Sequence, residues 1–186
     1  MELSGAIYGR RSTRSFTEEQ VGEAKLRELI KTATFAPSAM NEQPWRFTVV
    51  TNRPLLKKIS DAAKAYAMEE FGKESHIDHV RQMLSDATFD IFYEAPVLIV
   101  ISAPTASRWA VEDCALAAEN LMLAAHEMQL GACWIGFAQE WLGTPEGRQA
   151  IKLDEAYTPV APIIVGHVKT AMPHVDRRAP TINWIR

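Results

Sequence analysis

The sequence is poor in cysteine, has no excess of basic residues and contains no long uninterrupted apolar run. Its two cysteines, Cys114 and Cys133, cannot build a disulfide framework and lack metal-binding spacing, which predicts a reducing, cytoplasmic compartment. Twenty Lys and Arg residues against 23 Asp and Glu residues give a formal charge of −3, which argues against a dedicated nucleic-acid-binding protein. The most apolar segment, residues 110–130, contains Glu112, Asp113 and other polar side chains that would be costly inside a bilayer. We therefore expect no nucleic-acid partner, no membrane partner and no secretory signal.

Several common catalytic motifs are also missing from the sequence. It has no GxGxxG after a predicted strand, no phosphate-binding GxxxxGK[ST], no GxSxG and no HExxH. His76 and His79 are three residues apart and would share one face of a helix, as a pair of metal ligands can. A solvated polar face is the simpler interpretation of that pair, because no third ligand is near in the sequence. No metal site is predicted.

The 186 residues are 47% hydrophobic and 23% charged, the composition of one folded domain spanning residues 1–186. Apolar periodicity, proline and glycine predict helices over residues 3–9, from Thr17 to before Pro37, 54–71, 75–93, 109–130 and a short one from Thr144. Runs rich in β-branched and apolar residues predict strands over residues 45–51, 96–102, 132–135 and 162–168. Because helices outnumber strands and do not alternate strictly with them, the pattern favours an α+β fold.

Two helix ends are predicted from local signals. Thr17 and Gln20, three residues apart, have the spacing of a capping box, so a helix is expected to begin at Thr17. Gly131 is expected to end the helix over residues 109–130. The polar tail from residue 169 closes on an apolar segment, residues 182–185, which is expected to dock against another surface.

Arginine is concentrated near both ends of the chain. Arg10, Arg11 and Arg14 flank the hydroxyl of Ser12, and the tail contains Arg177 and Arg178. Planar guanidinium groups and hydroxyls are suited to binding a phosphate. A solvated basic surface is the alternative, and the sequence alone leaves both open.

Two loops have residues suited to contacting a heterocycle. Residues 36–45 place a hydroxyl and two amides between two prolines, and carboxamides match the mixed donor and acceptor edge of a flat ring. Gly136 follows the strand predicted over residues 132–135 and would let the backbone approach a ligand closely. Plain connecting loops are the alternative interpretation for both.

Four segments together resemble the FMN-dependent nitroreductase family. They are GRRSTRSF from residue 9, APSAMNEQPWRF from residue 36, EDCALAAENLMLAAHEMQLGACWIG from residue 112 and GHVKTAMPHVDRRAP from residue 166. The resemblance implies an α+β homodimer whose central, mostly antiparallel sheet is flanked by helices. It also implies two FMN sites at the subunit interface and C-terminal segments exchanged between the subunits.

The resemblance assigns expected roles to individual residues. Arg10, Arg11 and Ser12 are expected near the FMN phosphate with Arg177 and Arg178, and Arg14 near the pyrimidine edge of the flavin. The backbone of Ile135 and Gly136 is expected to approach the ring. The partner subunit is expected to add a loop to each site, and the residues of that loop are Pro37, Ser38, Ala39, Met40 and Asn41. Asp113 is expected at a position on the partner's side, near the site.

The resemblance further implies an oxidoreductase that passes hydride from NAD(P)H through FMN to an electron-poor small aromatic acceptor, such as a nitroaromatic compound or a quinone. No side chain is expected to act as nucleophile or general acid. Flavin reduction, flavin breakdown, dehalogenation and storage or sensing of flavin without turnover are the alternatives within this fold. Binding of an acidic protein or nucleic acid by the arginines, without flavin, is the alternative outside it.

Overall fold

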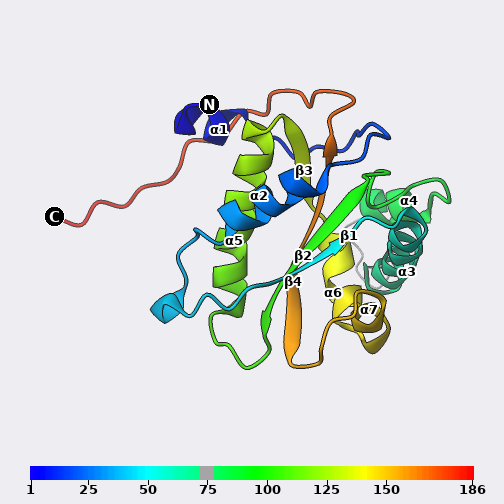
Figure 1. Cartoon of the computed structure of the whole chain (residues 1–186). Coiled ribbons are helices and arrows are strands. Elements are labelled where there is room, and N and C mark those ends of the chain that lie inside the picture. The colour runs from blue at the N-terminus through cyan, green and yellow to red at the C-terminus, as the bar shows by residue number, and fades with distance from the viewer. Residues whose placement is uncertain (72–77) are drawn as a thin grey trace.

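A computed structural model of the chain describes residues 1–71 and 78–186. Its centre is a four-stranded sheet in the order β1-β2-β4-β3, in which every neighbouring pair is antiparallel (Figure 1). The strands are β1 (Arg46–Val50), β2 (Val97–Pro104), β3 (Leu130–Trp134) and β4 (Tyr157–His167). The expected α+β architecture with an antiparallel sheet is confirmed.

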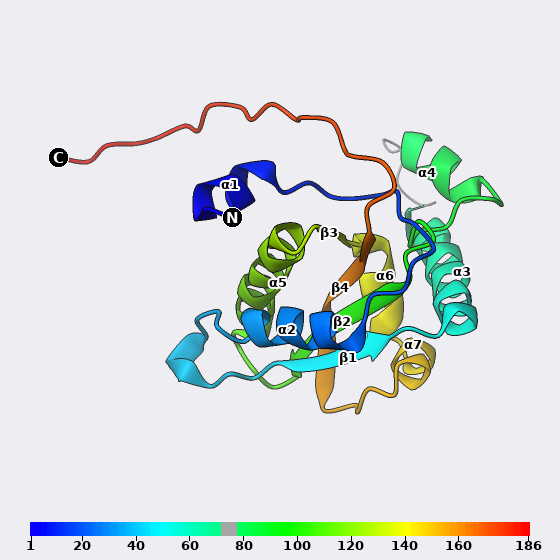
Figure 2. The same ribbon diagram turned by 45° about the horizontal axis from the view of Figure 1, so that its top comes forward.

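Helices cover both faces of the sheet, and the two views agree on this arrangement (Figures 1 and 2). One face packs against α2 (Glu23–Ala33) and α5 (Ala110–Glu127). The other face packs against α3 (Arg53–Phe71), α4 (Asp78–Ser85), α6 (Gly136–Gly143) and α7 (Pro145–Ala150). The short α1 (Leu3–Gly9) lies against α5.

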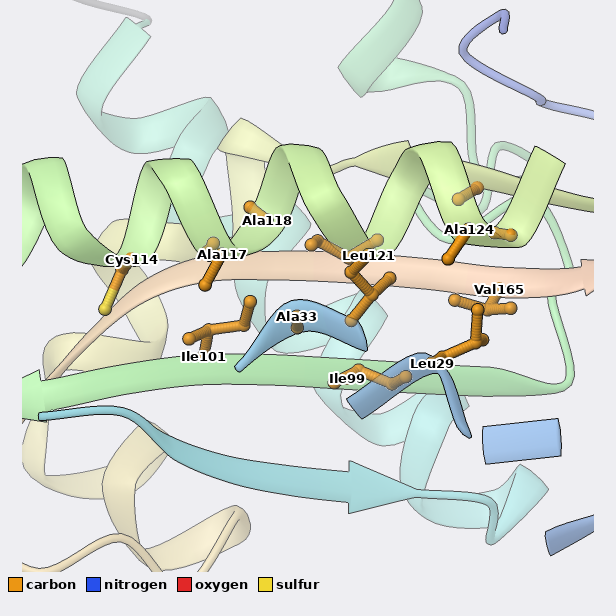
Figure 3. Packing of buried hydrophobic residues seen from close by; sticks show 14 of the residues in the cluster. Leu29, Ala33, Ile99, Ile101, Cys114, Ala117, Ala118, Leu121, Ala124 and Val165 are labelled. Carbon is orange, nitrogen blue, oxygen red and sulfur yellow. The ribbon is translucent and has the colours of Figure 1, made fainter. Parts of the chain in front are cut away.

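Alternation along β2 divides the core into two clusters. Ile99 and Ile101 point toward α2 and α5, whereas Leu98 and Val100 point to the opposite helices, and all four are fully buried. Figure 3 shows the first cluster, in which α5 presents Leu121 and several alanines to the sheet. A strand buried on both faces reads as a continuous apolar run, which is why β2 was recognisable from the sequence.

The helix expected to begin at Thr17 begins at Glu23 instead, with Gly22 as its N-cap. The backbone N–H of Thr17 donates to the carbonyl of His167, and Phe16 forms an antiparallel bridge with Val168. Pairing with the chain beyond β4 thus keeps this segment extended. The capping-box prediction was wrong because the hydroxyl of Thr17 accepts from the Glu19 N–H within a local turn.

The helix expected over residues 75–93 is shorter than predicted. Its start lies outside the described residues, as does His76 of the proposed histidine pair, and α4 ends at Ser85. Asp86 and Asp90 then accept hydrogen bonds from the backbone N–H groups of Thr88 and Phe92, two residues further on. Such aspartate turns compete with helix formation, so the chain turns twice before β2.

Gly131 does not end α5, which ends at Glu127, with two residues between it and the start of β3. Gln129 adopts the left-handed conformation there, with φ of 60°. Gly131 lies within β3, and a Cβ atom on it would come within 2.5 Å of the Thr13 side chain. The absence of a side chain at residue 131 therefore lets the N-terminal segment approach β3 closely.

Of the helices in residues 1–71 and 78–186, none is long and apolar enough to cross a membrane. Within the same residues, histidine, cysteine and acidic side chains form no cluster able to hold a metal ion.

Candidate functional site

The arginine-rich segment near the N-terminus runs alongside β3. Ser12 forms a parallel bridge with Ala132, and the Thr13 N–H donates to the Ala132 carbonyl at 3.0 Å. Thr13 is buried, so the side chains on either side of it are held by backbone pairing rather than by loose loop structure. This pairing brings the segment from residue 9 to β3, an edge strand of the sheet, where the segment from residue 112 ends.

The three arginines of this segment have different surroundings. Arg10 Nε is buried without a hydrogen-bond partner among the described residues, although Glu119 Oε1 lies 3.7 Å away. Arg11 donates to the carbonyls of Tyr8 and Arg10, at 2.6 and 2.9 Å. Arg14 is exposed. Arg10 and Arg14 therefore retain donors for a ligand, whereas Arg11 is largely engaged with the chain itself.

A cavity of about 310 Å³ opens where β3 ends and α6 begins. Arg14 borders it, Gly136 is exposed at the first position of α6, and a Cβ there would meet no atom within 4 Å. The first N–H groups of a helix have no partner within the helix and are available to acceptors. The walls are mostly apolar; besides Arg14 and Gly136 they comprise Ile91, Tyr93, Cys133, Trp134, Ile135 and Phe137.

A second cavity, of about 180 Å³, borders the same N-terminal segment and is lined by Arg10, Arg11 and His126 among others. Five predicted site residues therefore line one cavity or the other. The smaller cavity is lined by Arg10 and Arg11, and the larger by Arg14, Ile135 and Gly136. Ser12 lies between Arg11 and Thr13 and also hydrogen-bonds the Cys133 thiol. The structure thus places five of these six residues at two separate cavities that border residues 10–14, with Ser12 on the same segment.

Tyr93 is a cavity residue that the sequence interpretation missed. Its backbone is left-handed, with φ of 52°, and so is that of Glu94, with φ of 58°. Asp90 holds this turn, because its carboxylate accepts hydrogen bonds from the Ser60 hydroxyl and the N–H groups of Phe92 and Glu94. Paired aspartates at residues 86 and 90 were the available signal for turns here, but the residues were assigned to a helix.

The phenol of Tyr93 is held in its protonated form. Burial raises its pKa, and the charge and hydrogen bond of the Arg14 guanidinium only partly oppose that effect. Burial likewise raises the pKa of the Cys133 thiol despite the nearby Arg14. The cavity therefore presents a hydrogen-bonding phenol and an unreactive thiol rather than a nucleophile.

The predicted loop over residues 37–41 does not reach this cavity in the same chain. It forms the light-blue helical turn that projects away from α6 on the opposite side of the molecule (Figures 1 and 2). Met40, Asn41 and Gln43 are left-handed, with φ of 52°, 55° and 50°. Asp113 contacts the loop, because its Oδ1 accepts from the Ala39 N–H at 2.9 Å. Pro37, Met40 and Asn41 are exposed, and Ser38 and Ala39 are half-buried.

The C-terminal tail starts beside the arginine segment and then leaves the body of the molecule (Figure 1). His174 Nδ1 lies 2.8 Å from Arg11 Nη2, so the two ends of the chain do meet at this point. Arg177 and Arg178 follow in the extended part and are exposed. The described chain thus brings the tail, but not its two arginines, to the N-terminal cluster.

A model of the nitroreductase family matches residues 7–167, which include the arginine segment, the loop over residues 37–41 and all the lining residues of the larger cavity. The chain belongs to the nitroreductase family. The family resemblance drawn from the four sequence segments is thereby confirmed.

Individual relatives agree with this placement. A protein of Archaeoglobus fulgidus, named for NADH dehydrogenase or NAD(P)H nitroreductase activity, is 35% identical over 153 residues and covers 75% of each chain. The crystal structure of a nitroreductase with bound FMN from Bacteroides fragilis matches with a TM-score of 0.85 and 27% identity, covering 100% of both chains. An iodotyrosine deiodinase of Thermotoga neapolitana is 29% identical over 127 residues, which is 66% of this chain and 67% of that protein.

Proposed function

We propose that this nitroreductase-family chain binds FMN and is an NAD(P)H-dependent oxidoreductase. The observation that carries the proposal is the arrangement around residues 10–14. Arg10, whose buried Nε makes no hydrogen bond within the described residues and has only a 3.7 Å ion pair with Glu119, and the exposed Arg14 lie on one short segment paired with β3, beside an apolar cavity of about 310 Å³. A buried donor without an acceptor costs about 1–3 kcal/mol, which an anionic ligand would remove.

The residues present fit the parts of FMN. Arg10 and the Ser12 hydroxyl would hold the phosphate, joined by Arg177 and Arg178 once the tail folds back or is supplied by a second copy. The apolar side chains of Ile91 and Phe137 are suited to the flat ring. Backbone at Ile135 and Gly136 would meet the ring edge, and the space around residue 136, where a Cβ would meet no atom within 4 Å, leaves room for that approach.

When bound, FMN supplies the redox chemistry, accepting hydride from NAD(P)H in one half-reaction and reducing an electron-poor acceptor in the next. Arg14 contributes electrostatically, because its positive charge at the cavity stabilises negative charge on whatever occupies it. Tyr93 lines the same cavity, and its interaction with the guanidinium would orient Arg14 there. No nucleophile is needed at the cavity, in agreement with the protonated phenol and thiol found there.

We further propose that two copies of the chain complete the site. One chain holds the arginine segment and the cavity, while the loop over residues 37–41 projects away and is free to reach a partner. The tail ends in apolar side chains without cover in one chain: Ile182, Trp184 and Ile185 are 60%, 72% and 93% exposed. The exposed edge of β1 and the groove of about 450 Å³ between β1 and α2 would accept such a segment from a second copy.

The acceptor is proposed to be a small electron-poor aromatic compound, such as a nitroaromatic or a quinone, because the cavity is mostly apolar and opens beside a single cation. Reductive dehalogenation is the second candidate, favoured by the similarity to the deiodinase of Thermotoga neapolitana.

Visible spectroscopy tests the proposal in two steps. Purified protein titrated with FMN should retain a band at about 450 nm after desalting, since the isoalloxazine ring is the chromophore. Under anaerobic conditions NADH or NADPH alone should bleach that band, and nitrobenzene or a quinone should restore it. A protein that retains no flavin contradicts FMN binding, whereas a band that no nicotinamide bleaches favours storage or sensing of flavin.

A further inference from the structure

Asp113 is a buried carboxylate that joins the first turn of α5 to both ends of the projecting loop. It is 2% exposed, and its Oδ1 accepts the Ala39 N–H at 2.9 Å. Its backbone carbonyl accepts the indole N–H of Trp45, also at 2.9 Å. Asp113 therefore contacts the chain on both sides of the loop, at Ala39 through its carboxylate and at Trp45 through its backbone carbonyl.

We propose that Asp113 is a positioning residue, which holds the projecting loop and the two residues that follow it (residues 37–43) in the shape that completes the FMN site of a second copy. This inference depends on the proposed function, because it assigns the loop to a partner's site. Asp113 touches no ligand itself. Its carboxylate acts through Ala39 near the start of the loop, while its backbone carbonyl, which a residue of any type would offer, holds Trp45 beyond the end of the loop.

The loop needs such an anchor because its backbone is unfavourable. Three of its residues are left-handed although none is glycine: Met40, Asn41 and Gln43. Each would relax toward ordinary backbone angles if the ends were free. The contacts inside the loop, from the Gln43 N–H to Ser38 Oγ at 3.0 Å and from Gln43 Nε2 to Asn41 Oδ1 at 3.1 Å, are exposed and open to competition from water. The two contacts to Asp113 are part-buried, so water competes with them less than with the exposed contacts inside the loop.

Packing of α5 alone does not account for a carboxylate at this position. Asp113 Oδ2 is buried with no hydrogen-bond partner among the described residues. A buried carboxylate with an unpaired oxygen is unfavourable, and an apolar side chain would pack the helix at lower cost. What the carboxylate provides is an acceptor for Ala39, which no aliphatic side chain can replace.

Two substitutions separate the anchoring role from simple loss of stability. Asp113→Ala removes the acceptor, whereas Asp113→Asn keeps an oxygen that can accept the Ala39 N–H. Thr144→Ala is the matched control, because Thr144 caps α7 by accepting the Gly147 N–H at 3.1 Å, and that cap contacts neither the loop nor either cavity. The first readout is hydrogen exchange of the Ala39 amide in protein without flavin. The second is FMN affinity from quenching of flavin fluorescence.

We expect Asp113→Ala to speed exchange at Ala39 and to weaken FMN binding, each by about tenfold, the effect of one lost hydrogen bond to a charged group. Asp113→Asn should restore both to within about threefold of the parent protein. Thr144→Ala should lower the melting temperature and leave both readouts unchanged. If Asp113→Ala does not fold, Trp45→Phe removes the second contact alone, and it should speed exchange in the loop and weaken FMN binding.

Unchanged exchange at Ala39 in Asp113→Ala would overturn the anchoring role. Faster exchange with unchanged FMN affinity would overturn the link between the loop and the site. If Asp113→Ala is not obtained, faster exchange with unchanged FMN affinity in Trp45→Phe would likewise overturn the link between the loop and the site. Failure of the parent protein to bind FMN is a different outcome, which contradicts the proposed function and leaves the exchange measurement to decide the anchoring.

Discussion

Single residues near the N-terminus differ in the hydrogen-bond donors they retain. Arg11 donates to two carbonyls of its own chain, so its guanidinium is largely occupied. Arg10 has a buried Nε with no acceptor within hydrogen-bond distance among the described residues. Although the sequence presents Arg10 and Arg11 as equivalent neighbours, the tertiary environment makes Arg10 the stronger candidate for phosphate binding.

Replacing Arg10 by alanine should weaken FMN binding by about 1.5–3 kcal/mol, the contribution of a charged hydrogen bond. Arg178→Ala should give a similar loss if the tail supplies the second arginine. The measurement is fluorescence titration of FMN with flavin-free protein. Lys58→Ala is the control, because it removes one exposed positive charge from α3, outside both cavities. Parent-like affinity in both arginine variants would remove the two side chains from the site.

Tyr93 should make stability depend on pH in the alkaline range. Burial raises the pKa of its phenol above the ordinary 10.0, so near and above pH 10 the folded protein holds a proton that the unfolded chain releases. Stability due to this group is complete below pH 10 and is lost as the pH rises through the folded pKa. Denaturant unfolding of the parent and of Tyr93→Phe between pH 8.5 and about 11 should show a steeper fall for the parent. Parallel curves would contradict the shift.

Among the elements, α5 is central to both the core and the candidate site. Its inner face is buried against the sheet and α2 (Figure 3), its first turn holds Asp113, and its last turn brings His126 to the smaller cavity. Cys114 follows Asp113 in α5 and is buried. Burial, together with the Asp113 charge, raises the pKa of the Cys114 thiol to about 12. That thiol is therefore expected to be inert to alkylating reagents in the folded protein.

Leu121→Ala should destabilise the protein by about 2–5 kcal/mol, because the fully buried Leu121 fills the contact between α5, α2 and the sheet. Leu3→Ala is the matched control, since Leu3 is 69% exposed on α1 and should change stability by no more than about 0.5 kcal/mol. Denaturant unfolding of both variants measures the difference. Equal stabilities would contradict the packing of α5 onto the sheet.

Elements were predictable wherever local sequence and tertiary packing agree. The apolar run of β2 and the proline and periodicity of α3 placed both within two residues of their observed bounds. The prediction failed at Thr17, where pairing with residues 167–168 overrides a helix-start signal, and at residues 86–93, where aspartate turns replace helix. Helix α6 was not predicted, because its eight residues show no strong period.

At the scale of the whole molecule, the unpartnered surfaces define the expected assembly. The extended tail, the projecting loop and apolar residues on the outer side of α5, including Val111 and Leu116, are all exposed in one chain. Large exposed apolar side chains in continuous surfaces indicate interaction with another protein surface. A second copy of the chain is the partner proposed above.

Deleting residues 179–186 tests that assembly. The full chain should be a dimer and the shortened chain a monomer with weakened FMN binding, because both the apolar end of the tail and the partner's loop would be lost from each site. Light scattering after size-exclusion chromatography measures the mass, and Thr181→Ala is a full-length control that leaves the apolar side chains in place. A full-length chain that is monomeric at micromolar concentration would contradict the exchange of tails.

The sequence by itself determined the α+β class, most of the strands and the identity of the arginine-rich segment, because these depend on local chemistry and periodicity, and the resemblance of its four segments determined the family. Only the tertiary structure decided which of those arginines keeps a free donor, that Tyr93 reaches the cavity, and that Asp113 anchors the loop. These features arise from contacts between residues distant in the sequence. Ser12 meets Ala132, Tyr93 meets Arg14 and Ala39 meets Asp113, and no local pattern encodes such pairings.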